Sequence, residues 1–312
     1  MAVTVTDAFF NSSDGIHKIH TLVWKDDAQE PVGVVQLAHG VAEHIERYDD
    51  FARFLVSLGF VVAGNDHLGH GKSVNTVDEL GFFAAKDGDV RMVDDMHILY
   101  NIMSKKYPGK PYFLFGHSMG SMLARHYCTV FGYELSGAIF CGTGNVPAVL
   151  STVKPALDAV INKLGPASRK IDFFAMNSAS YNKDYKDEKD PLAWLSKNAE
   201  NREKYANDPF CGFGLTAGGF RDLSAVAIKI SGPDWALKIP VGLPILFISG
   251  AKDPVGGNGK WVLKAAEELE RAGNEPTVIL YPGDRHEILN EDDKRLVYKD
   301  VESWLKETLA TL

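Results

Sequence analysis

Short, mostly apolar runs bounded by turn residues alternate along the chain with longer stretches of helical periodicity. The apolar runs predict buried strands at residues 33–38, 60–64, 111–115, 137–141, 244–249 and 277–281. Between them, apolar positions three or four apart predict helices at 47–58, 87–106, 118–130, 259–272 and 291–309. Repeated strand–helix units imply a mostly parallel sheet with helices on both faces.

Two parts of the chain depart from this alternation. At the start, an alternating run at 4–10, a turn cluster at 11–15 and a second run at 16–24 predict a hairpin that adds an antiparallel edge. From about residue 145 the pattern becomes irregular, with helical pieces, several aromatic residues and a charged run, until the alternation resumes. We therefore expect an α/β core formed by residues 1–144 and 236–312, with a mainly helical cap inserted at 145–235.

Composition narrows the class of protein. The chain has 312 residues, 45% of them apolar and 24% charged, which is typical of an ordinary globular protein. Its net charge of −8 argues against nucleic acid as a partner. No apolar stretch approaches the roughly 20 residues of a membrane span, and the first residues do not resemble a secretory signal. Three widely spaced cysteines fit reduced thiols, so we expect a cytoplasmic location.

The sequence Gly-His-Ser-Met-Gly at residues 116–120 directly follows one predicted strand and begins the next predicted helix. G-x-S-x-G in this context predicts a nucleophile elbow, a sharp turn that exposes the Oγ atom of Ser118 at the carboxyl edge of the sheet. The two glycines are expected because the neighbouring strand and helix leave no room for a Cβ atom.

Two residues further along the chain are placed to complete a triad with Ser118. Asp253 and His286 each lie in the loop after a predicted strand, in the order Ser, acid, His that an α/β-hydrolase requires. Alone, Asp253 before Pro254 fits a simple turn, and an isolated His286 fits a surface loop. Their joint placement favours catalysis, with Asp253 orienting the imidazole and His286 serving as base.

Other candidates are weaker. Asp284 is a rival acid, but two residues before His286 it is badly placed to reach the imidazole Nδ1 atom. His67 and His70 have metal-like spacing, yet they lie in a glycine-rich loop without an obvious third ligand. Residues 69–73 and 256–260 both fail the phosphate-loop pattern. We expect neither a metal nor an organic cofactor.

Acyl transfer also needs hydrogen-bond donors for the developing oxyanion. In this geometry the donors are backbone N–H groups, one from the residue after the nucleophile and one from the loop after an early strand. Loop position assigns these roles to Met119 and Val41.

Several further stretches carry a family resemblance. They are His39-Gly40, Glu43-His44, Arg47-Tyr48, and the segments 66–73, 116–120, 208–213, 252–256 and 285–291. Together they resemble the monoacylglycerol lipase and lysophospholipase branch of the α/β-hydrolases, often labelled serine aminopeptidase-like. The resemblance implies the same triad and oxyanion donors, and a helical cap over an acyl-binding tunnel. Lipases of this family commonly have glycine or alanine after His-Gly, so the β-branched Val41 predicts a narrower acyl pocket.

The resulting hypothesis is a serine hydrolase that cleaves carboxylic esters of lipophilic acyl groups, such as a monoacylglycerol or a lysophospholipid. Substrate contacts in the cap are expected from Phe173, Phe174, Phe210 and Phe213. The same machinery serves an aminopeptidase, an amidase or a thioesterase, and a ligand-binding protein on a hydrolase scaffold is the non-enzymatic alternative. An epoxide hydrolase or dehalogenase is disfavoured, because each needs a carboxylate where Ser118 stands. Transient membrane contact through the cap and the oligomeric state stay open.

Overall fold

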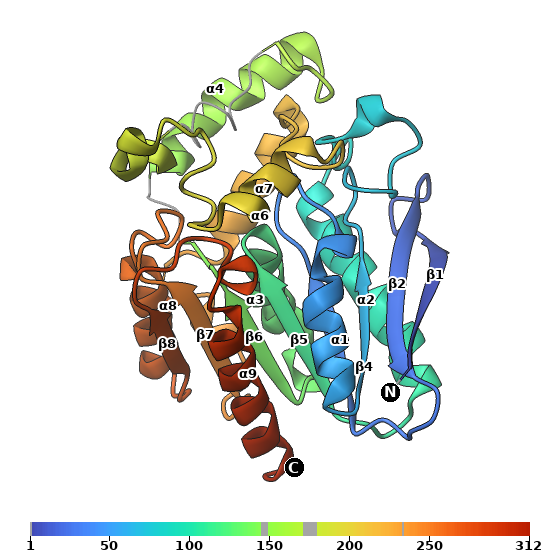
Figure 1. Ribbon diagram of the computed structural model, residues 1–312. Coiled ribbons are helices and arrows are strands. Elements are labelled where there is room, and N and C mark those ends of the chain that lie inside the picture. Colours follow the sequence, from blue (N-terminus) through green and yellow to red (C-terminus); the bar gives the residue numbers. More distant parts are fainter. Residues whose placement is uncertain (1, 145–148, 171–179, 233) are drawn as a thin grey trace.

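The computed structural model describes residues 2–144, 149–170, 180–232 and 234–312. Within them, eight strands form one sheet in the order β1-β2-β4-β3-β5-β6-β7-β8 (Figure 1). The strands are β1 (Val3–Asn11), β2 (Lys18–Asp26), β3 (Gly33–Ala38), β4 (Phe60–Asn65), β5 (Tyr112–His117), β6 (Gly137–Cys141), β7 (Ile245–Gly250) and β8 (Thr277–Tyr281). Strands β3 to β8 run parallel, and β2 pairs antiparallel with both β1 and β4. The predicted fold class and the hairpin edge are confirmed.

Helices cover both faces of the sheet, as Figure 1 shows. Helices α1 (Asp49–Ser57) and α9 (Lys294–Leu309) pack on one face, and α2 (Gly88–Lys106), α3 (Met119–Phe131) and α8 (Lys260–Arg271) pack on the other. Short 3-10 helices connect these elements: η1 (Ile45–Tyr48), η2 (Val77–Glu79), η3 (Gly132–Glu134), η4 (Tyr181–Glu188), η5 (Ala236–Lys238) and η6 (Ile288–Asn290).

The central strands are buried on both faces, which explains their continuous apolar runs. In β5, Phe113 and Phe115 face the core shared with α1 and α9, whereas Leu114 faces the opposite core with α3. The Phe115 ring lies 5.0 Å from that of Phe51 on α1. On the other face, the Phe140 ring lies 5.2 Å from that of Phe247. Packing on both faces of the sheet holds in place the strands whose carboxyl ends carry the candidate site.

Two predicted helices begin later than expected. The helix predicted at 47–58 starts as the 3-10 turn η1, and its α-helical part begins at Asp49. The helix predicted at 291–309 begins at Lys294. Glu291 is extended there, and its carboxylate accepts hydrogen bonds from the Ser196 hydroxyl and the Lys197 N–H. The Glu291 side chain therefore holds the segment at residues 196–197 in place, and the helix begins after Glu291.

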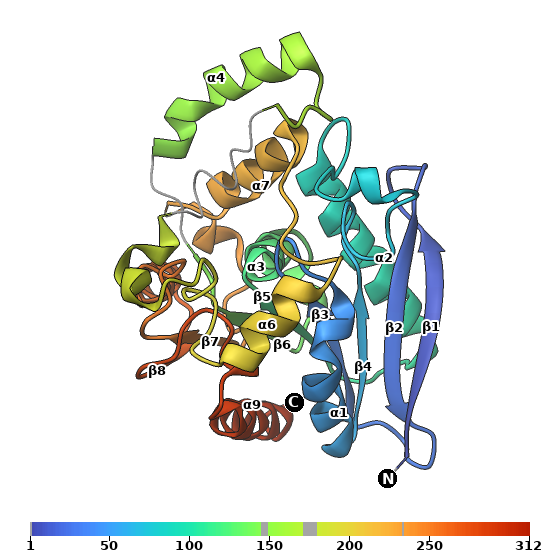
Figure 2. The same ribbon diagram turned by 45° about the horizontal axis from the view of Figure 1, so that its top comes forward.

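The chain between β6 and β7 is called here the β6–β7 segment, and its described residues lie over the carboxyl ends of the strands (Figures 1 and 2). The helices in its described residues are α4 (Val149–Leu164), α6 (Ala199–Asn207) and α7 (Ala217–Lys229), together with η4 and η5. The cap boundaries at residues 144 and 235 stay a prediction. Among the described residues, no helix is both long enough and apolar enough to cross a membrane.

Candidate active site

Ser118 occupies the turn between β5 and α3 in a strained backbone conformation. Its φ of 53° and ψ of −120° are unusual for a residue with a side chain. A Cβ atom on Gly116 would lie 2.3 Å from the Gly120 carbonyl oxygen, and one on Gly120 would lie 2.0 Å from the Ala38 carbonyl oxygen. The predicted need for both glycines is confirmed, and Ser118 lines a cavity at this edge of the sheet.

Asp253 and His286 meet at the same edge of the sheet. They follow β7 and β8, which are adjacent strands, so their loops leave the sheet side by side. His286 Nδ1 lies 3.0 Å from Asp253 Oδ2, and the Val255 N–H donates to Asp253 Oδ1 at 2.8 Å. Both side chains are buried. Asp253 therefore lies where it can orient the imidazole through Nδ1, and its role as the acid of a triad stays a prediction.

Asp284, the rival acid, has a different partner. Its carboxylate forms an ion pair with Lys197, and its backbone N–H donates to the Tyr281 carbonyl. Burial raises the pKa of Asp284, opposed by the hydrogen bond from Lys197. The structure thus places Asp253, and not Asp284, in hydrogen-bond contact with His286.

The loop after β3 passes directly over the elbow. A Cβ atom on Gly40 would lie 2.6 Å from Glu43 Oε1 and 3.1 Å from the Ser118 Cβ atom, so a side chain there would displace these neighbours. Strand β3 is the neighbour of β5, which brings the loop into place. Val41 follows in that loop, and Met119 is the first residue of α3, where a backbone N–H has no acceptor within the helix. Both expected oxyanion donors therefore flank Ser118, and their role stays a prediction.

A cavity of about 420 Å³ opens above these residues. Gly40, Val41, Ser118 and His286 line its floor, and the described part of the β6–β7 segment supplies Asn182, Pro191, Leu192, Trp194, Leu195, Tyr205 and Phe213. The Trp194 ring lies 5.3 Å from that of His286. The walls of the cavity are mainly apolar. Its volume falls in the range of about 300–1,000 Å³ that is typical of small-molecule sites.

The expected substrate contacts are distributed unevenly. Phe213 lines the cavity, whereas Phe210 packs against His44, with ring centroids 5.8 Å apart, beside a separate open groove. Phe173 and Phe174 lie outside the described residues. Sequence reasoning did not select Leu192, Trp194 or Leu195. They come from an irregular stretch without periodicity, so no pattern in the sequence marks them.

A buried charge network connects the loops of the site. Arg47 donates to Glu43 at 2.5 Å and to both carboxylate oxygens of Glu287 at 2.6 and 2.7 Å. Glu43 also accepts from the Gly40 N–H at 2.6 Å, and His117 Nδ1 lies 3.3 Å from it. Although burial favours their neutral forms, Arg47 lowers the pKa of both Glu43 and Glu287, and both carboxylates are thus charged. The network thus connects Gly40, whose loop lies beside Ser118, to Glu287, which follows His286.

A second group of buried polar residues lies behind the loop after β3. The rings of His39 and His67 are 4.4 Å apart, and those of His39 and His70 are 5.2 Å apart. Burial, followed by repulsion among the histidines, lowers the pKa of each to about 3. These imidazoles are therefore neutral at physiological pH, and they form part of the packing beneath the site.

A family model described as serine aminopeptidase, S33, matches residues 29–293. The chain belongs to this family of α/β-hydrolases. Its relatives include the monoacylglycerol lipase of Mycolicibacterium smegmatis, 31% identical over 91% of each chain. The human monoglyceride lipase is 26% identical over 92% of this chain and 86% of that protein.

A solved structure is also similar over nearly the whole chain. The thermostable carboxyl esterase of Bacillus coagulans, in complex with glycerol, superposes with a TM-score of 0.93. It is 32% identical and covers 98% of this chain and 99% of that one. The family resemblance predicted from the sequence motifs is confirmed.

Proposed function

We propose that this chain hydrolyses carboxylic esters of lipophilic acyl groups, with monoacylglycerols as the substrate class, through an acyl-enzyme on Ser118. Family membership and the relatives named as lipases and an esterase make it an ester-hydrolysing enzyme. The observation that carries the finer proposal is the convergence of Ser118, His286 and an apolar-walled cavity, with Asp253 bound to the far side of the imidazole.

In the proposed reaction, His286 Nε2 accepts the Ser118 hydroxyl proton as Oγ attacks the ester carbonyl carbon. The Val41 and Met119 N–H groups donate to the resulting oxyanion. His286 then gives the proton to the leaving alcohol oxygen, and the carbon–oxygen bond of the ester breaks. Water, deprotonated by His286, attacks the acyl-enzyme and releases the acid. Asp253 holds the tautomer and stabilises the imidazolium throughout.

The substrate class rests on the cavity and on the relatives. Val41, Leu192, Trp194 and Phe213 offer an apolar surface for an acyl chain. The structure of the Bacillus coagulans esterase contains glycerol. The two relatives are named as a monoacylglycerol lipase and a monoglyceride lipase, and both names describe enzymes that cleave glycerol esters. A glycerol ester of one fatty acid contains both an apolar acyl chain and a glycerol group.

Cleavage of peptides from a free amino terminus has less support. An aminopeptidase needs an unpaired carboxylate at the site to bind the amine. Among the described residues lining the cavity, the carboxylates are Glu43 and Glu287, and both are paired with Arg47. Glu188, in η4 of the β6–β7 segment, pairs with Arg285. Ester cleavage therefore fits the site better than amine-directed peptidase activity.

A substrate panel tests the proposal. Monoacylglycerols of several chain lengths, a lysophospholipid, a thioester, an anilide and an aminoacyl amide are offered to the parent protein and to Ser118→Ala. Ser57→Ala, at an exposed serine on α1, is the matched control. We expect ester hydrolysis by the parent and the control, and none above background by Ser118→Ala. Faster cleavage of the amides than of the esters would contradict the proposal, and tight binding without turnover would favour a binding protein.

A further inference from the structure

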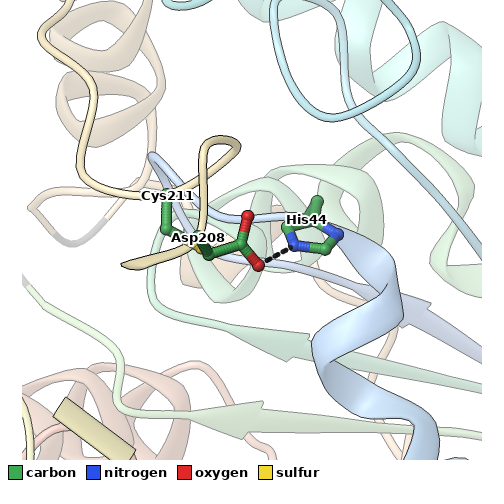
Figure 3. A group of neighbouring side chains, drawn as sticks. All are labelled: His44, Asp208 and Cys211. Carbon is green, nitrogen blue, oxygen red and sulfur yellow. Dashed lines mark hydrogen bonds and ion pairs between the residues drawn. The ribbon is translucent and has the colours of Figure 1, made fainter. Parts of the chain in front are cut away.

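His44, Asp208 and Cys211 converge from two segments that are far apart in the sequence (Figure 3). His44 lies in the loop before η1, and the other two lie in the turn after α6. One ligand atom from each residue lies within 4.8 Å of the others, and the His44 Nε2 atom is 2.8 Å from Asp208 Oδ2. An imidazole nitrogen, a carboxylate oxygen and a sulfur thus surround one point in space.

Hydrogen bonds from the backbone hold this arrangement in place. Asp208 accepts the Cys211 N–H at its carbonyl, at 3.0 Å, and the Phe210 N–H at Oδ1, at 2.8 Å. The turn is fixed to the loop of His44, because the Gly212 N–H donates to the Ala42 carbonyl at 2.9 Å. The loop of His44 and the turn that carries Asp208 and Cys211 are therefore held next to each other.

The donor set selects the kind of metal. Nitrogen and sulfur ligands together with one carboxylate suit Zn²⁺ and are poor for Mg²⁺ or Ca²⁺, which prefer all-oxygen shells. His44 and Asp208 line an open groove of about 1030 Å³, which leaves room for a water molecule as a fourth ligand. The groove also contains more carboxylates than cationic side chains. The carboxylates are Glu46, Asp50, Glu200, Glu203 and Asp208, and the cations are Arg47, Lys204 and Lys294.

We propose that His44, Asp208 and Cys211 bind one Zn²⁺ ion, with water completing a tetrahedral shell. The thiol of Cys211 loses its proton to solvent when the sulfur–zinc bond forms, and the neutral His44 ring coordinates through Nε2. The ion takes the place of the hydrogen bond between His44 and Asp208. It connects the loop that follows β3 to the turn after α6, and this bridge stabilises the folded chain.

The site is distinct from the hydrolytic residues. Ser118 and His286 line a different cavity, Asp253 contacts His286, and the proposed reaction needs no metal. A test of zinc binding is therefore independent of a test of ester hydrolysis. His67 and His70, the metal-like pair in the sequence, contribute no ligand to it.

Cobalt binding to the purified full chain tests the proposal, because a cobalt–thiolate bond absorbs in the near ultraviolet and tetrahedral Co²⁺ absorbs strongly in the visible. We expect one Co²⁺ per chain, both absorptions, and displacement of the cobalt by Zn²⁺. Cys211→Ser should lose the thiolate absorption, and Cys211→Ser and His44→Gln should each weaken Zn²⁺ binding at least about tenfold. Cys128→Ala, at a cysteine buried in α3, should leave both unchanged.

Circular dichroism of each variant without metal checks that it is folded, and thermal unfolding gives a second measurement. Zn²⁺ should raise the midpoint of the parent and of Cys128→Ala, but not that of Cys211→Ser. A cobalt spectrum without thiolate absorption, or equal zinc affinity in the parent and Cys211→Ser, would overturn the proposal. In either case His44 and Asp208 would be joined by a simple hydrogen bond.

Discussion

Arg47 donates both terminal nitrogens to the carboxylate of Glu287, the residue that follows His286. The same guanidinium reaches Glu43, whose carboxylate accepts the N–H of Gly40 above Ser118. One cation thus links the loop of the proposed base to the loop of the proposed oxyanion donor. All three charged side chains are largely buried, so each depends on the others for stability.

Replacing Arg47 with leucine should therefore destabilise the fold strongly. Two buried carboxylates would lose their counter-charge, at a cost of about 3–5 kcal/mol in the free energy of unfolding. Urea denaturation of the purified variant measures this cost. Arg53→Leu is the matched control, because Arg53 pairs with Asp49 on the exposed side of α1, where a salt bridge contributes about 0–1 kcal/mol. Equal losses in both variants would show that the network does not stabilise the site.

The two candidate acids can be separated by matched amide substitutions. Asp253→Asn should lower kcat by about 10⁴-fold, since the imidazole would lose the partner that fixes its tautomer. Asp284→Asn should retain most of the activity, because its carboxylate contacts Lys197 and not His286. Steady-state kinetics on one short-chain ester compare the two. A larger loss for Asp284→Asn would transfer the role of acid to that residue.

Most of the fold could be predicted from periodicity, and the candidate triad from position. Ser118, Asp253 and His286 each follow a strand, and parallel strands end at one edge. The contact between Arg47 and Glu287 could not be predicted, because 240 positions separate them and each alone resembles a surface charge. The cavity wall at Leu192 and Trp194 comes from an irregular segment, whose path depends on tertiary contacts that no local pattern encodes.

Val41 should limit the length of acyl chain that the enzyme accepts. Its β-branched side chain lines the cavity, so Val41→Ala enlarges the cavity and leaves the backbone N–H in place. We expect the ratio of kcat/KM for a decanoyl ester to that for a butyryl ester to rise several-fold, as one or two methylenes of apolar contact are worth about 1–3 kcal/mol. A chain-length series of p-nitrophenyl esters measures the ratio. An unchanged or reduced ratio would show that the acyl chain binds away from Val41.

Acid should destabilise the folded chain in a window set by its buried histidines. The pKa values of His39, His67 and His70 fall from 6.5 to about 3 on folding, so the unfolded chain binds more protons between these pH values. Their stabilising contribution is present above pH 6.5 and is lost as the pH falls toward 3. His126, whose pKa burial lowers to about 4, adds to this trend, whereas Asp95 and Asp222, whose pKa values burial raises to about 6, oppose it.

This loss of folding stability should be visible as a lower urea midpoint at pH 4.5 than at pH 6.5. His70→Gln removes one of the three histidines, and the difference between the two midpoints should become smaller whatever the variant's own stability. Stability that rises on acidification, or a pH dependence identical in parent and variant, would argue against a buried neutral His70.

Trapping the acyl-enzyme tests the central claim most directly. The parent protein is mixed with an excess of a slowly hydrolysed lipophilic ester, quenched in acid within the first turnover, digested and analysed by mass spectrometry. We predict that the protein gains the mass of one acyl group, that the modified peptide carries it on Ser118, and that Ser118→Ala shows no such gain. An acyl group on another residue, or rapid ester cleavage without any acylated protein, would contradict the account.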